Sequence, residues 1–161
     1  MNRSLARTLL AGSAGVALVV VPLASPAGAA TRYKVDVHGL GTYTSTATGV
    51  TPTGTATGEP FDGAFTATLG ANDGSLPEPG VCEPATATLR LEGSRDRFLE
   101  LAATGNVCGK WVQPPTSVVT QVFTGRYAVT ASSQRRLVGT DGFYEVRLAD
   151  DGRASVFAID T

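Results

Sequence analysis

The segment from Cys82 to Cys108 reads as a hairpin whose two arms match residue by residue. A fold-back centred on Arg95 brings six apolar side chains to one face, because strand side chains alternate between two faces. These pairs are Leu91 with Leu99, Leu89 with Leu101, and Ala87 with Ala103. On the other face Arg90 lies opposite Glu100, an attractive cross-strand pair. Because Cys82 then faces Cys108 at the open end, the sequence predicts a disulfide-clasped β-hairpin.

The start of the chain has the three-part layout of a secretory signal peptide. Arg3 and Arg7 form a basic start. An apolar run from Thr8 to Leu23 follows, and small residues at Ala27–Ala29 fit the cleavage rule. A transmembrane anchor is the alternative, but this run is interrupted by glycines and shorter than the roughly 20 apolar residues of a span. We therefore expect a signal peptide over 1–29 and a secreted, extracellular protein.

The remaining residues, 30–161, have the length of a single domain. The leader holds two of the 13 basic residues and none of the 14 acidic ones, so the mature net charge is about −3. This charge argues against nucleic-acid binding, and we expect no membrane association after cleavage. The two cysteines most simply form one disulfide. With no Cys-x-x-Cys pattern and a single histidine, His38, we expect neither a cofactor nor a metal site.

After the leader, apolar side chains recur with period two and no long stretch has a helical period. A turn is expected at Val50–Gly54. A two-residue turn at Asp151-Gly152 would pair Leu148 with Ser155 and Val146 with Phe157. About eight to ten short strands favour an all-β antiparallel meander closed, or nearly closed, into a barrel, with a two-sheet sandwich as the alternative. The expected inward set is Phe61, Phe65, Leu89, Leu91, Leu99, Leu101, Phe123, Tyr127, Tyr144, Val146 and Phe157.

The strongest candidate binding residues follow the second cysteine: Trp111, Gln113, Pro114 and Pro115. A tryptophan presents a large apolar body with a polar tip, which suits interfaces, and the proline pair would hold it stiffly. The alternative is that Trp111 fills the barrel end beside the disulfide.

Three classes of function remain open. The first is a non-enzymatic domain that binds a glycan, a small apolar ligand or a partner protein. The second is a small hydrolase or cyclase at the barrel mouth, with acids such as Asp36 or Glu145 and with His38 as a further candidate, although His38 also fits an ordinary surface residue. The third is an extracellular protease inhibitor with an exposed loop at 70–80 or 110–116.

Five stretches carry a resemblance: Pro79–Thr88, Val107–Pro115, Val122–Tyr127, Gly139–Val146 and Ser155–Asp160. They are similar to small secreted actinobacterial proteins of no assigned activity, so the resemblance implies an exported all-β domain and transfers no site residue. The stretch Ser155–Ala158 is also similar to the end of secreted subtilisin inhibitors. Those proteins resemble a helix-bearing fold with two disulfides, from which this chain departs.

Overall fold

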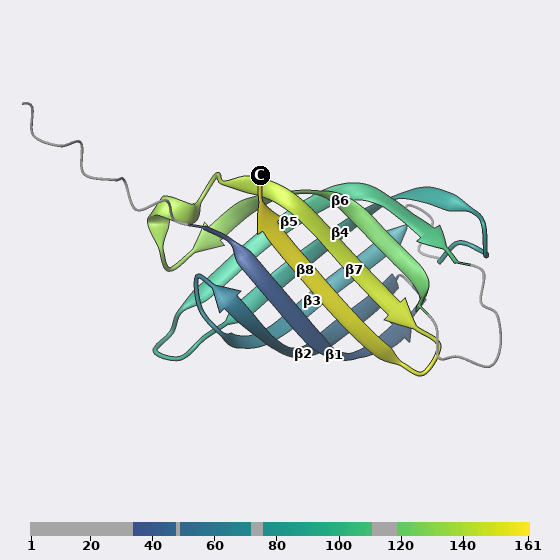
Figure 1. The fold of residues 1–161 in the computed structure, drawn as a ribbon, viewed down its shortest axis with the longest axis horizontal. Coiled ribbons are helices and arrows are strands. Elements are labelled where there is room, and N and C mark those ends of the chain that lie inside the picture. The colour runs from purple at the N-terminus through teal and green to yellow at the C-terminus, as the bar shows by residue number, and fades with distance from the viewer. Residues whose placement is uncertain (1–33, 48, 72–75, 111–118) are drawn as a thin grey trace, which may run out of the picture. The chain divides into compact units, whose positions relative to one another are not determined.

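A computed structural model describes residues 34–47, 49–71, 76–110 and 119–161. Eight antiparallel strands pair in chain order, and β1 pairs with β8 to close the barrel (Figure 1). The strands are β1 Asp36–Thr46, β2 Gly49–Glu59, β3 Gly63–Ala71, β4 Cys82–Glu92, β5 Phe98–Gly109, β6 Val119–Ser132, β7 Asp141–Ala149 and β8 Arg153–Asp160. A 3-10 turn at Arg135–Leu137 joins β6 to β7. Within the described residues no helix has the length and apolar character of a membrane span. The expectation of a closed antiparallel barrel is confirmed.

The barrel interior is filled by side chains. Alternate residues of every strand point inward and form one contiguous apolar cluster, with Tyr127, Tyr144 and Phe123 among its largest members. Gly39 makes room for this cluster on β1, because a Cβ there would collide with the side chains of Val156 and Phe65. The expected inward set is confirmed with the exception of Phe157.

The clasped hairpin is confirmed as β4 and β5. Their register pairs Cys82 with Cys108 and each expected leucine with its partner, and the two cysteines form a disulfide. Arg90 forms the expected ion pair with Glu100 on the outer face. Since disulfides persist where thiols are not kept reduced, this bond indicates an oxidising environment.

The last hairpin differs from the expectation by one residue. Arg147 of β7 lies opposite Ser155 of β8, and Val146 lies opposite Val156. The cause is a three-residue connection over 150–152, in which Gly152 has a φ of 84° and donates its N–H to Ala149 O at 3.1 Å. Such a loop ends on a left-handed residue, and it contains one residue more than the expected turn.

This one-residue shift exchanges the two faces of β8, because side chains alternate with period two. Ala154, Val156 and Ala158 are buried inside the barrel. Ser155 and Phe157 therefore point outward, where both are half-buried.

The turn expected at Val50–Gly54 is also wrong, since these residues lie within β2. Proline lacks the N–H that a ladder needs. The pairing of β2 with β3 passes from Val50 to Thr53 without a pair at Thr51 or Pro52, so the strand accommodates the proline.

The disulfide should stabilise the domain substantially. Its cysteines are 26 residues apart, and for a closed loop of this size the chain-entropy model gives about 3.5 kcal/mol. We expect a Cys82→Ala/Cys108→Ala variant to lose about this much unfolding free energy in urea denaturation. Wild type measured in reducing agent should match the variant, whereas equal stability of the oxidised and variant proteins would contradict the prediction.

The register of β8 can be tested by truncating two phenylalanines. Phe123 is fully buried, so Phe123→Ala should cost about 3–5 kcal/mol of unfolding free energy. Phe157 lies on the outer wall, so Phe157→Ala should cost about 1 kcal/mol, the size of one aromatic contact. Comparable losses for the two variants in urea denaturation would mean that Phe157 belongs to the interior.

Candidate binding groove

Two adjoining hollows lie on the outer wall formed by β7, β8 and β1. The first has a volume of about 480 Å³ and the second about 320 Å³, and both are shallow and open to solvent. They share Leu40, Arg147 and Ser155, so we treat them as one outer groove. Its lining residues are His38, Gly39, Leu40 and Gly41 of β1, Phe143, Glu145, Arg147 and Ala149 of β7, and Arg153–Phe157 of β8.

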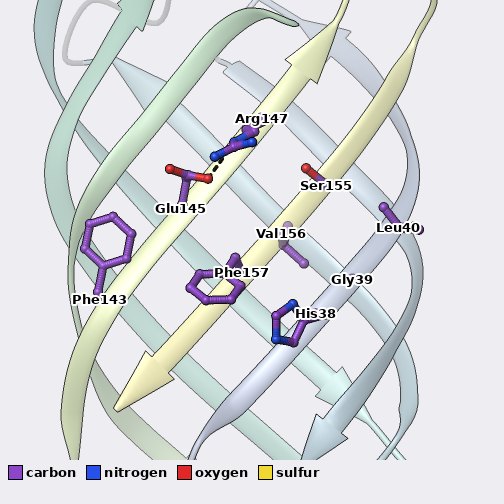
Figure 2. A pocket seen from close by; sticks show the side chains of 9 residues that line it. All are labelled: His38, Gly39, Leu40, Phe143, Glu145, Arg147, Ser155, Val156 and Phe157. Carbon is purple, nitrogen blue, oxygen red and sulfur yellow. Dashed lines mark hydrogen bonds and ion pairs between the residues drawn. The ribbon is translucent and has the colours of Figure 1, made fainter. Parts of the chain in front are cut away.

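The groove exists because a small side chain lies between two long ones. Ser155 on β8 is directly opposite Leu40 on β1 and directly opposite Arg147 on β7. Figure 2 shows the short serine side chain between its two longer neighbours. Serine therefore forms a low floor, and the neighbouring strands supply the walls.

One end of the groove is aromatic. His38 is directly opposite Phe157 across the β1–β8 pairing, and their ring centroids lie 4.6 Å apart at an interplanar angle of 72°. This edge-to-face arrangement is favourable for aromatic rings. Phe143 of β7 adds a third ring, so that the three rings form a row across the wall (Figure 2).

Hydrogen bonds with residues near the start of β1 hold the His38 side chain in place. Asp36 Oδ1 lies 3.0 Å from His38 Nε2, and Lys34 Nζ donates to Asp36 Oδ2 at 2.8 Å. The hydrogen bond from Lys34, with a smaller contribution from His38, lowers the pKa of the Asp36 carboxyl below its ordinary value of 3.8. Asp36 therefore stays ionised over a wide pH range and anchors the imidazole beside Phe157.

The β7 side of the groove carries a charged pair. Arg147 Nε donates to Glu145 Oε1 at 2.6 Å, and both residues belong to the outer face of β7. Across the groove stands Leu40, whose exposed fraction of 73% is unusually high for a leucine. The groove thus combines apolar and aromatic surface with a hydroxyl, a carboxylate and a guanidinium group.

The residues expected to bind, Trp111, Gln113, Pro114 and Pro115, lie outside the described part of the structure. The same is true of most of the 110–116 loop, and the 70–80 loop is described only in part. The corresponding hypotheses stay predictions.

The three residues considered for catalysis do lie on one wall. Asp36 contacts His38, and His38 and Glu145 both line the first hollow. They lie on the outside of the barrel, with Phe157 between His38 and Glu145 (Figure 2). Within the described residues, no serine donates a hydrogen bond to His38, both cysteines are in the disulfide, and no three metal-ligating side chains gather.

Several groove residues were missed by sequence reasoning. Strand alternation could have found Leu40, since buried Val35 and Val37 imply that His38 and Leu40 point outward. Phe157 was assigned to the interior by the wrong turn length. The meeting of β1 with β8 had no local sequence signal at all.

Comparisons of this chain with protein-family models, curated proteins and solved structures give no match.

The Asp36 interaction predicts a pH effect with a definite sign. A carboxyl whose pKa is lowered by folding stabilises the fold above its unfolded-state pKa, and this contribution is lost as pH falls through the lower folded pKa. An NMR titration should therefore place the Asp36 midpoint below 3.8. Lys34→Met should move the midpoint upward, because it removes the main hydrogen-bond donor. An unchanged midpoint in the variant would show that Lys34 is not the cause.

Proposed function

We propose that the protein is a secreted, non-enzymatic binding domain and that its outer groove binds a glycan. Export is supported by the signal-peptide pattern of residues 1–29 and by the disulfide, which suits an oxidising compartment.

The observation that carries the glycan assignment is the composition of the groove. A pyranose ring has an apolar C–H face and a rim of hydroxyl groups. The aromatic end, Phe143 and Phe157, offers surface for the apolar face. Ser155 and the carboxylate of Glu145 offer hydrogen-bonding groups for the rim.

Two other modes of binding are less well supported. An apolar ligand inside the barrel would compete with the cluster of side chains that already fills it. A partner that adds a strand needs a free sheet edge, but each described strand is paired on both sides. The outward-facing side chains are therefore the surface through which this barrel can contact a ligand.

Binding is also favoured over catalysis. Nucleophilic catalysis needs a nucleophile and its base within hydrogen-bond reach. Asp36 could orient His38, but among the described residues no hydroxyl or thiol is bonded to the imidazole, which lies on an exposed wall where little water is excluded. Glu145 is likewise engaged, since it accepts from Arg147.

The proposal can be tested by calorimetric titration of the oxidised mature protein with a panel of oligosaccharides and cell-wall fragments. Phe157→Ala should weaken binding about tenfold, the equivalent of 1.4 kcal/mol, and Ser155→Trp should abolish it by filling the floor of the groove. Phe98→Ala is the matched control, because Phe98 is a half-buried phenylalanine on β5, outside the groove. Failure of the whole panel to bind, or binding that ignores both groove variants, would overturn the proposal.

A further inference from the structure

Resting on the proposed function, we infer that the outer groove selects acidic glycans, with Arg147 receiving the carboxylate of a uronic acid or a similarly carboxylated sugar. Among the described residues, Arg147 has free donors on one edge, a serine hydroxyl lies opposite it, and the charges of the groove lining are paired.

The guanidinium group of Arg147 is held by one hydrogen bond and has further N–H donors that no described residue uses. Its Nε is bonded to Glu145 Oε1 at 2.6 Å, which fixes the plane of the guanidinium group. In the described part of the chain, no hydrogen bond uses Nη1 or Nη2 of this residue. Because Arg147 lines both hollows, these donors stand at the centre of the groove.

Two other outer-wall arginines differ from Arg147 in the use of their Nη nitrogens. Arg90 makes a similar Nε bond to Glu92 at 2.7 Å, but its Nη1 is also bonded to Glu100. Arg126 uses Nη2 to reach Asp141 at 2.7 Å. Both of these guanidinium groups have an acid of the barrel on an Nη nitrogen, whereas Arg147 presents its Nη edge to the groove.

The opposite side of the groove supplies a complementary group. Ser155 is the direct cross-strand neighbour of Arg147. Its hydroxyl has no hydrogen bond within the described residues. A carboxylate between the two can accept from the guanidinium group and from the hydroxyl, while the attached sugar ring extends toward Phe157.

The charges of the groove favour a group of low charge. Its two arginines are each paired with an acid, Arg147 with Glu145 and Arg153 with Asp151. A carboxylate brings one negative charge to these pairs, whereas a phosphate monoester brings about −1.5 to −2 at neutral pH. The planar carboxylate also matches the two parallel N–H donors of an arginine.

The test uses oxidised mature protein and sugars in matched pairs. The probes are oligosaccharides containing galacturonate, glucuronate or muramic acid, each compared with its methyl ester, which keeps the ring and removes the charge. At least one acid should bind about tenfold more tightly than its ester at low salt. The difference should shrink at 1 M salt, because screening weakens exposed charge interactions.

Two variants test whether Arg147 causes the preference for the acid over its ester. Arg147→Gln should abolish the preference, so that each acid and its ester bind with equal affinity. Arg90→Gln is the matched control and should preserve the tenfold preference, because Arg90 lies on β4, outside the groove.

The outcomes separate this inference from the proposed function. Equal affinity for every acid and its ester, or tighter binding of a sulfated or phosphorylated sugar, overturns the carboxylate assignment and leaves glycan binding in place. A preference that survives Arg147→Gln overturns the role of Arg147. If neither acids, esters nor neutral glycans bind, the proposed function fails as well.

Discussion

Closure of the barrel by β1 and β8 is the constraint on which the rest of the structure depends. Every other pairing joins strands that are neighbours in the sequence, and such contacts form at a modest cost in chain entropy. The β1–β8 pairing joins the two ends of the domain (Figure 1), and it continues beyond the strands through Asp160 N–H to Val35 O at 2.9 Å. Without this β1–β8 pairing, which we call the seam, one edge of each terminal strand would have unpaired backbone N–H and C=O groups.

The packing of the interior allows β1 and β8 to approach and pair. Gly39 lets the side chains of Val156 and Phe65 pack where β1 meets β8. A Cβ at this position would push the two strands apart or displace the ring of Phe65. The same backbone that admits these interior side chains forms part of the groove surface on the outside, so interior packing and the outer groove share one short stretch of β1.

The parts of the fold that could be predicted from the sequence are the parts specified locally. The clasped hairpin has several independent constraints on its register, namely apolar pairs, an ion pair between Arg90 and Glu100, and the cystine, and all of them agree. The last hairpin has only alternation and a turn signal. Alternation survives a shift of one residue, with the faces exchanged, so the length of the Asp150–Gly152 loop decided which side Phe157 occupies.

The candidate groove was harder to predict for a related reason. Its parts are ordinary in isolation: an exposed leucine, a histidine, a serine and an ion pair at scattered positions. The serine and the ion pair meet within the last hairpin, but the leucine and the histidine join them only through the pairing of strands about 120 residues apart. Such distant pairing leaves no periodic pattern in the sequence. Sequence reasoning therefore identified Asp36, His38 and Glu145 as chemically interesting residues but could not show that Phe157 lies between His38 and Glu145.

The position of the groove across the seam links recognition to folding. His38 and Leu40 belong to β1, whereas Phe157 and Ser155 belong to β8, so a ligand in the groove contacts both sides of the closure. These contacts are absent from any state in which the terminal strands have separated. A ligand that binds only the closed form stabilises it by mass action, in proportion to the logarithm of ligand concentration over its dissociation constant. Glycan binding at this wall would therefore strengthen the one pairing of the barrel that is most expensive to form.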